Sequence, residues 1–212
     1  MRLVLASNNP GKLAELQALF APLAVELVPQ GALALAEVDE PHATFIENAL
    51  AKVRHAAHGA GGPAIADDSG LCVDALGGEP GVASAHYASI AALPGDDRES
   101  HRRRQDAANN ALLLERMRGR ADRGARFVST LVAVRHALDP EPLVAIGRWH
   151  ATLLDALRGS GGFGYDPLVF VVAEGRTVAE LDPDRKNSIS HRALAASHML
   201  ALMADAWALG RR

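Results

Sequence analysis

Hydrophobic and polar positions follow two different periods along this chain. Short apolar runs typical of strands, beginning with residues 3–6, alternate with longer segments of helical spacing. In the first of these longer segments, apolar residues recur at Leu13, Leu16 and Phe20. Because alternating strands and helices pack as layers on one sheet, the pattern predicts an α/β fold.

The pattern also marks where several helices begin and end. A T-x-x-E capping box predicts a helix from Thr44 to about His58, and the "GAGGP" run at 59–63 is expected to stop it. A second T-x-x-E signal at 177–180 predicts another helix start. A final amphipathic helix is expected to begin near His191.

The remaining apolar runs predict strands. We expect "AIA" at 64–66 to be a buried strand that ends at the acidic turn "DDSG". Residues 126–136 and 143–154 predict two long strands of an antiparallel hairpin, and residues 168–172 predict a further strand. If the early strands are parallel, the sheet is mixed.

Two segments lack either period and are expected to be loops. Residues 76–88 are rich in turn formers, and residues 93–110 carry many charges. The three arginines at 102–104 form either a patch for a polyanion or a solvated face. The solvated face is the favoured interpretation, because most charge runs are surface features.

Length and composition narrow the class of protein. With 212 residues, 49% of them hydrophobic, and no linker, we expect one domain over residues 1–212. The net charge is −3, so we expect neither a nucleic acid nor a membrane partner. The single Cys72 excludes an intramolecular disulfide, and neither a signal peptide nor an apolar run of roughly 20 residues is present. These features lead us to expect a soluble cytoplasmic protein.

The adjacent acids Asp67 and Asp68 are the first candidate for chemistry. Two neighbouring carboxylates repel each other unless a cation compensates them, so we expect a divalent metal or a polyanion bound through one. One carboxylate would then hold the metal or polarise a water, and Ser69 would contact a phosphate. An exposed turn in which both acids are solvated is the alternative.

A second candidate is a phosphate site in "SNNPGK" at 7–12, between the first strand and the first helix. Backbone N–H groups at a helix start, a glycine and Lys12 suit phosphate oxygens, although the motif is not a P-loop. Glu40 is either an acid that favours the helix start or an oxygen donor suited to Mg²⁺. Lys52 lies two turns into the helix that Thr44 begins, where an ordinary surface lysine is the alternative to a functional one. The alternative for 7–12 itself is a plain Asn-Pro-Gly turn.

Two later stretches are candidates for contacts with a ligand. In "GGFGYDP", Phe163 would stack on a base and Asp166 would accept hydrogen bonds from a ligand. In "KNSISHR", Lys186, His191 and Arg192 gather cationic groups near the last helix. The alternatives are aromatic packing at a strand entrance and an ordinary capping histidine.

In order and separation, six motifs of this chain resemble the inosine triphosphate pyrophosphatase family. They are "SNNPGK", "TFIENALAK", "ADDSGL", "LGGEPGVASAHYA", "GGFGYDP" and "KNSISHRA", and the resemblance spans residue 3 to about 205. It implies Mg²⁺-dependent hydrolysis of ITP, dITP and XTP to the nucleoside monophosphate and pyrophosphate. It also implies a homodimer and a long, curved mixed sheet flanked by helices, with two lobes and the nucleotide cleft between them.

The resemblance assigns a role to individual positions. Asp68 matches the proton acceptor, and Glu40 and Asp68 would bind Mg²⁺. The residues that would bind the substrate are Ser7, Asn8, Asn9, Pro10, Gly11, Lys12, Lys52, Ser69, Phe163, Gly164, Tyr165, Asp166, Lys186, His191 and Arg192. Donors from His191 and Arg192 would favour bases with a 6-oxo acceptor over adenine.

The chain departs from the family pattern in places. His86 stands where arginine is frequent, the segment 93–110 looks long, and "SNN" replaces the equally familiar "TGN". Two other functions stay open. One is a related pyrophosphatase for modified pyrimidine nucleotides, and the other is a nucleotide sensor without catalytic activity.

Overall fold

The computed structural model describes residues 1–21, 25–93 and 95–208. Its contacts divide the chain into two compact units. Unit 1 comprises Met1–Ser69, Val128–Arg148 and Asn187–Arg212, and unit 2 comprises Gly70–Phe127 and Trp149–Lys186. The expected single domain with a nucleotide cleft between two lobes stays a prediction.

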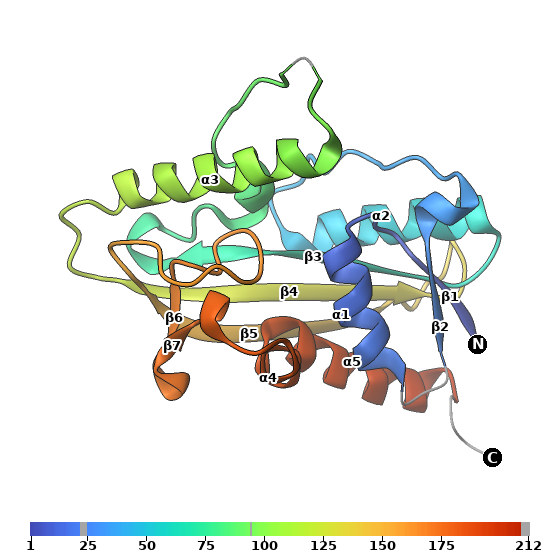
Figure 1. The fold of residues 1–212 in the computed structure, drawn as a ribbon. Coiled ribbons are helices and arrows are strands. Elements are labelled where there is room, and N and C mark those ends of the chain that lie inside the picture. The colour runs from blue at the N-terminus through green and yellow to red at the C-terminus, as the bar shows by residue number, and fades with distance from the viewer. Residues whose placement is uncertain (22–24, 94, 209–212) are drawn as a thin grey trace. The chain divides into compact units, whose positions relative to one another are not determined.

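Within the described residues, seven strands form one sheet in the order β2-β1-β3-β4-β5-β6-β7 (Figure 1). They are β1 Arg2–Leu5, β2 Glu26–Pro29, β3 Ala64–Val73, β4 Gly124–Val134, β5 Leu143–Leu153, β6 Val169–Val171 and β7 Arg176–Thr177. β1 pairs in parallel with β2 and β3, whereas β6 pairs antiparallel with β5 and β7. The predicted mixed sheet is therefore confirmed.

Five α-helices lie in the described part of the chain. They are α1 Pro10–Phe20, α2 Phe45–Ala60, α3 Arg98–Arg116, α4 Pro183–Ile189 and α5 His191–Ala206. Short 3-10 turns lie between these elements, including Asp74–Leu76, Gly81–His86 and Val178–Glu180. None of these helices is long and apolar enough to cross a membrane.

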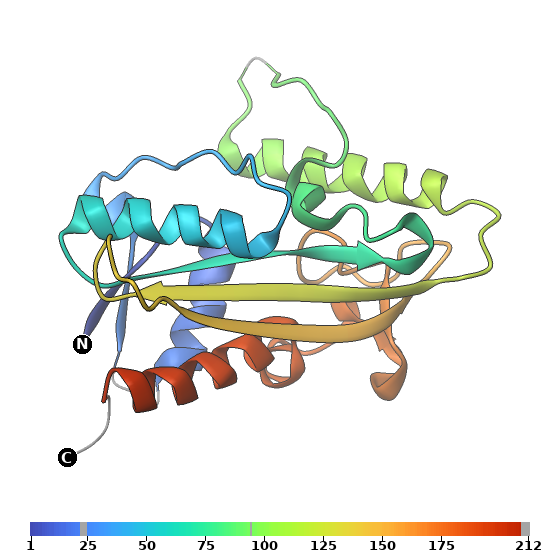
Figure 2. The same ribbon diagram turned by 180° about the vertical axis from the view of Figure 1, so that it is seen from behind.

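In unit 1, helices cover both faces of the sheet (Figure 2). On one face, Leu3, Leu5 and Ile65 pack in a buried cluster with residues of α1 and α5. On the other face, the intervening residues of the strands, such as Val4 and Ala66, pack against α2. Successive strand residues point to opposite faces, so this alternation also separates the side chains that follow along β3.

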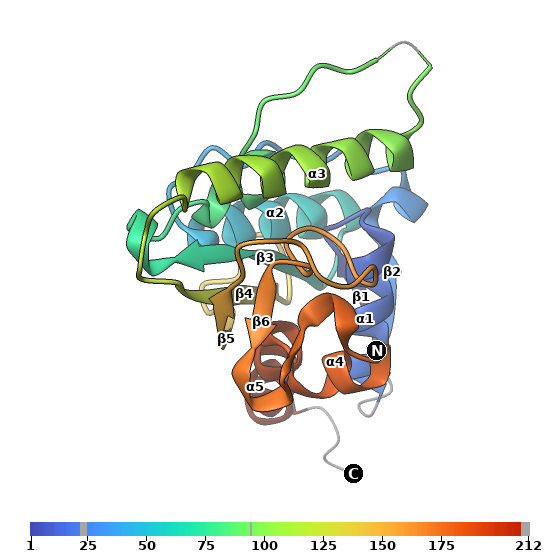
Figure 3. The same cartoon turned by 60° about the vertical axis from the view of Figure 1, so that its left-hand side comes forward.

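In unit 2, α3 packs against the turn Gly81–His86 and faces the loop that precedes β6 (Figure 3). Two buried hydrogen bonds tie these parts together. Tyr165 Oη donates to the backbone oxygen of Ser84 at 2.9 Å, and Asn109 Nδ2 donates to the same oxygen at 3.2 Å. The buried amide side chains of α3 are thus part of its packing, whereas Arg103, in the middle of the arginine run at 102–104, is exposed.

Several predicted helix boundaries are confirmed. Thr44 is the N-cap of α2, and its side chain accepts from the Glu47 amide. Gly61 ends that helix in a left-handed conformation with a φ of 62°, which favours glycine. Ser190 caps α5, which begins at His191 as expected.

Three local predictions are wrong. β3 does not end at Ala66 but continues to Val73, so the acidic pair lies within a strand. Residues 98–110 are helical rather than a loop, and residue 94 lies outside the described residues. The buried face of α3 consists largely of Gln105, Asn109 and Asn110, so its helical period is invisible among hydrophobic residues. The capping box at 177–180 forms, but only a 3-10 turn follows it.

Candidate active site

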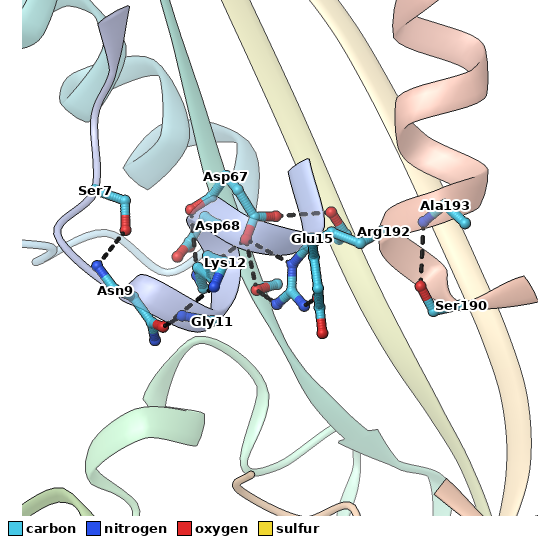
Figure 4. A network of polar contacts seen from close by, with 12 residues as sticks. Ser7, Asn9, Gly11, Lys12, Glu15, Asp67, Asp68, Ser190, Arg192 and Ala193 are labelled. Carbon is cyan, nitrogen blue, oxygen red and sulfur yellow. Dashed lines mark hydrogen bonds and ion pairs between the residues drawn. The ribbon is translucent and has the colours of Figure 1, made fainter. Parts of the chain in front are cut away.

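Asp67 is enclosed by partners from unit 1 (Figure 4). Its Oδ2 lies 3.0 Å from Lys12 Nζ and 3.2 Å from Arg192 Nε. Ser129 Oγ donates to Oδ1 at 2.7 Å, and Ser69 Oγ donates to Oδ2 at 2.9 Å. Burial alone would raise the pKa of Asp67, but the charges of Lys12 and Arg192 outweigh it and hold that pKa well below its usual range. Asp67 is therefore a buried, compensated anion.

Asp68 has a separate set of neighbours. Its Oδ1 accepts from Lys52 Nζ at 3.0 Å, and the same Nζ lies 3.1 Å from Glu40 Oε2. Burial raises the pKa of Asp68 to about 6, and the neighbouring Glu40 adds to the rise while Lys52 opposes it. Burial would also raise the pKa of Glu40, but Lys52 and a hydrogen bond with Asp68 lower it. Asp68 and Glu40 thus share one lysine.

The two adjacent acids are compensated by cations, as expected, and protein side chains supply them; a divalent metal at this pair stays a prediction. Asp67 follows Ile65 on the face of α1 and α5, and Asp68 follows Ala66 on the face of α2. Each carboxylate has cations of its own from the protein, Lys12 and Arg192 for one and Lys52 for the other. The repulsion between the two carboxylates is reduced because they lie on opposite faces of β3 and because each pairs with its own cationic side chains.

The oxygens of Asp68 and Glu40 suit a divalent cation. Asp68 Oδ2 is buried, no nitrogen or hydroxyl donor of the described residues reaches it, and the group beside it is the Glu40 carboxyl. Mg²⁺ commonly takes one or two carboxylates and completes its shell with water and substrate phosphates. Among the described residues, no group of three or more His, Cys, Asp or Glu side chains is placed to hold a metal. The two carboxylates therefore fit Mg²⁺ as a partial ligand set.

The segment 7–12 forms a structured helix entry. Asn9 caps α1, and its Oδ1 accepts from the amides of Gly11 at 2.9 Å and Lys12 at 3.2 Å. Ser7 Oγ accepts from the Asn9 amide at 3.2 Å, and Pro10 occupies the first turn. These bonds hold the helix start in one conformation, with Lys12 directed at Asp67.

Asn8 faces a different segment from its neighbours. Its Oδ1 accepts from the Gly31 amide at 2.8 Å, and its Nδ2 donates to Glu37 Oε1 at 2.9 Å. A Cβ on Gly31 would lie 2.5 Å from Asn8 Oδ1, so this contact needs a glycine. Asn8, the first asparagine of "SNN", thus links the start of α1 to residues 31 and 37.

Arg192 is bound by protein acceptors at all three guanidinium nitrogens. Nε contacts Asp67, Nη2 donates to Ser69 Oγ at 2.9 Å, and Nη1 pairs with Glu15. Burial would lower the pKa of Arg192, but Asp67 and Glu15 raise it. The guanidinium predicted to read a base is therefore engaged in holding Asp67. His191, which precedes it, is 5% exposed at the first turn of α5.

Sequence reasoning missed Glu15 and Ser129. Both had a detectable signal, because an acid beside Leu16 on α1 and a hydroxyl inside the apolar run "FVSTLV" are polar groups where burial is expected. Each such group needs a partner, and here the partners are Arg192 and Asp67.

The remaining predicted residues gather in unit 2. Asp166 Oδ2 accepts from Lys186 Nζ at 3.0 Å and from the Phe163 amide at 3.0 Å. Lys186 Nζ lies 4.6 Å from the centroid of the Phe163 ring. Gly164 directly follows Phe163 in the chain. Tyr165 is 4% exposed, and its hydroxyl donates to the backbone oxygen of Ser84. Tyr165 is therefore an anchor of the loop.

Comparisons with known proteins agree with the motifs. The model of the Ham1 family matches residues 3–202. The chain is 66% identical over 207 residues to a dITP/XTP pyrophosphatase of Methylibium petroleiphilum, covering 98% of this chain and 99% of the relative. It is also 66% identical over 211 residues to a dITP/XTP pyrophosphatase of Leptothrix cholodnii, covering 99% and 100%. A solved HAM1 protein from Coxiella burnetii superimposes with a TM-score of 0.85 at 39% identity, over 97% of this chain and 99% of that one. These matches run through almost the whole chain, and the chain belongs to the Ham1 family.

Proposed function

We propose that this protein hydrolyses ITP, dITP and XTP to the nucleoside monophosphate and pyrophosphate, and so removes deaminated purine nucleotides from the precursor pool. The observation that carries the proposal is the cluster of Lys52, Glu40 and Asp68, with a buried Asp68 oxygen that no donor of the described residues reaches. Relatives at 66% identity that are named dITP/XTP pyrophosphatase support it.

The phosphate end of the substrate would meet unit 1. Lys12 and Lys52 carry the positive charge, and ion pairs to Asp67, Asp68 and Glu40 hold their ammonium groups in place before substrate arrives. Charges fixed in advance stabilise a developing negative charge without reorganisation. The amides at the start of α1 add donors of the kind that phosphate oxygens accept.

Asp68 would act as the proton acceptor. Asp68 Oδ2, which no nitrogen or hydroxyl donor of the described residues reaches, can take a proton from an attacking water or orient that water. Glu40 and Asp68 would hold Mg²⁺, which supplies charge neutralisation on phosphate oxygens and lowers the pKa of a bound water. Before Mg²⁺ binds, the ion pairs of Lys52 with Glu40 and Asp68 hold the two carboxylates close together.

The base end would meet Phe163, Lys186 and His191. An aromatic face stacks on any base, and the ammonium beside the Phe163 ring is a donor for the 6-oxo group that hypoxanthine and xanthine carry. Adenine presents a donor at that position, which would face the donor ammonium and offer it no acceptor. In line with the family resemblance, we also propose a homodimer in the cytoplasm.

The test is a panel of ITP, XTP, dITP, GTP, dTTP and UTP with identification of the products. We expect ITP, XTP and dITP to give monophosphate and pyrophosphate, and EDTA to abolish turnover. A preference for dTTP or UTP would favour the pyrimidine alternative. Binding of ITP without product would favour a sensor, and release of diphosphate and phosphate would refute the bond assignment.

A further inference from the structure

Helix α3 presents three residues to the Phe163 loop, one helical turn apart. Arg102, Asp106 and Asn110 occupy positions i, i+4 and i+8, which lie on one face of a helix. All three contact residues 163–164. The helix and the loop both belong to unit 2, so the arrangement is internal to that unit.

The two polar groups of Gly164 are both bound by this face. Its amide donates to Asp106 Oδ2 at 3.0 Å, and its carbonyl oxygen accepts from Asn110 Nδ2 at 2.8 Å. Asn110 Nδ2 also donates to the Asp106 carbonyl oxygen at 2.9 Å, which fixes the orientation of the amide group. Gly164 has a φ of 60°, a left-handed turn conformation that these bonds hold in place.

The two residues that bind Gly164 are partly or fully buried. Asp106 is partly buried, and this burial raises the pKa of its carboxyl, opposed by the Gly164 amide and by the charge of Arg102. Asn110 is 5% exposed. Polar groups removed from water need defined partners, and here the partners are the backbone groups of the loop.

The same loop is fixed from inside by Asp166. Its Oδ2 binds the Phe163 amide and Lys186, and a Cβ on Gly162 would lie 2.0 Å from that oxygen. The Phe163 ring then has Lys186 Nζ at 4.6 Å and Arg102 Cζ at 5.8 Å from its centroid. The position of the ring is therefore set by contacts on both sides of the loop.

We propose that Arg102, Asp106 and Asn110, together called the α3 clamp, are positioning residues that hold the Phe163 ring ready for the base of the nucleotide. The inference rests on the proposed function, in which Phe163 contacts that base. A loop ordered in advance loses little conformational freedom on binding, so the clamp contributes to affinity for the base. Its residues touch neither the phosphate end nor the reacting atoms.

The first test compares Asp106→Ala with Asp106→Asn, which keeps an oxygen acceptor for the Gly164 amide. Glu115→Ala, an exposed acid on the same helix, is the matched control. For Asp106→Ala we expect KM for ITP to rise about fivefold to tenfold with kcat changed by less than about twofold, the signature of lost uniform binding. Asp106→Asn and Glu115→Ala should stay within about twofold of wild type in both constants. An unchanged KM in Asp106→Ala would overturn the inference.

Inorganic tripolyphosphate, used as a competitive inhibitor, reads the phosphate end alone. Its inhibition constant should be the same in wild type and Asp106→Ala, because the clamp acts on the base end. A parallel rise of this constant and of KM for ITP would show general loss of structure and refute the clamp. If Asp106→Ala does not fold, Asn110→Ser removes the other half of the clamp and is held to the same criteria.

Amide hydrogen exchange of residues 162–166 separates this inference from the proposed function. In the free protein, Asp106→Ala should exchange faster there than wild type and Glu115→Ala, whatever the substrate is. Failure of the wild-type protein to hydrolyse ITP would refute the proposed function, but the exchange rates of residues 162–166 would still test the clamp. Unchanged exchange would refute the clamp even in an active enzyme.

Discussion

At the scale of single residues, the two adjacent aspartates have different environments because strand residues alternate between faces. Asp67 is 1% exposed and bound by Lys12, Arg192 and Ser129. Asp68 has one oxygen that no donor of the described residues reaches, and burial raises its pKa to about 6. A fully bonded carboxylate supports structure, whereas an incompletely bonded one is available for chemistry.

This difference predicts opposite outcomes for two isosteric substitutions. Asp67→Asn removes the buried carboxylate that pairs with Lys12 and Arg192, and we expect the free energy of unfolding to fall by about 3–5 kcal/mol. Asp68→Asn keeps the fold, since a neutral side chain is tolerated where burial already disfavours the carboxylate. Its pyrophosphate release from ITP should fall at least about a hundredfold, as for loss of a general base.

Urea unfolding and steady-state release of pyrophosphate measure the two effects. Asp74→Asn is a control for the loss of one carboxylate, because that side chain is 51% exposed and pairs with Arg126 at the surface. Equal destabilisation by Asp67→Asn and Asp68→Asn, or turnover within about tenfold of wild type in Asp68→Asn, would contradict the assignment.

The residue types of the site could be predicted from sequence, but their partners could not. The tandem acids are visible because they follow an apolar run, and Lys12 because it ends the polar turn "SNNPGK" before the first helix. Whether Asp67 and Asp68 share a face depends on their lying in a strand rather than a turn, a choice that local propensity does not decide. The pair of Arg192 with Glu15 joins positions 177 residues apart, so no local pattern contains it.

At the scale of elements, helix ends were more predictable than the packing between elements. Thr44 and Ser190 cap α2 and α5 through their own side chains, and such caps are local in sequence. The approach of β5 to α5 is not local. At Gly147 a Cβ would lie 2.0 Å from the carbonyl oxygen of His191 and 2.5 Å from the amide nitrogen of Ala195.

This approach predicts a large effect of Gly147→Ala. Because both close atoms belong to the backbone of α5, no side-chain rotation relieves the clash, and the first turn of α5 must move. We expect the free energy of unfolding to fall by about 3 kcal/mol or more, the upper end for overpacking. Gly62→Ala is the matched control, since its Cβ would meet no atom closer than 4.0 Å.

Chemical denaturation of the two variants is the measurement. The displaced turn carries Arg192, so Gly147→Ala should also weaken the contacts of that guanidinium with Asp67 and Ser69. Stability of Gly147→Ala equal to that of Gly62→Ala would show that α5 does not approach β5 so closely.

At the scale of the whole molecule, each compact unit is assembled from segments that are distant in the chain. Unit 1 uses three segments, and its core places Leu3, Leu131 and Met199 in one buried cluster. The alternation of strand and helix predicts a layered α/β fold, but it does not say which segments share a core. That information lies in side-chain complementarity between segments more than a hundred residues apart, which a single sequence does not display.

The pH dependence of global stability offers a last test, through the connection between β4 and β5. Asp139 is buried there, and its carboxylate accepts from the Arg135 amide at 2.9 Å, from Arg135 Nε at 2.8 Å and Nη2 at 2.7 Å, and from the Glu141 amide at 3.1 Å. The hydrogen bonds of Arg135 outweigh burial and hold the pKa of Asp139 well below its usual range.

A carboxyl whose pKa is lower in the folded than in the unfolded protein stabilises the fold above its unfolded pKa of about 3.9, and loses that contribution as the pH falls. Asp139→Asn should therefore reduce the free energy of unfolding at neutral pH, and the gap to wild type should narrow on acidification below about pH 4. Urea unfolding of both proteins at neutral pH, at about pH 5 and at about pH 3 measures the gap. Glu141→Gln, which changes an exposed partner of the same arginine, should leave it nearly unaffected. A gap that stays constant or widens in acid would mean that Asp139 is not bound by Arg135 in this way.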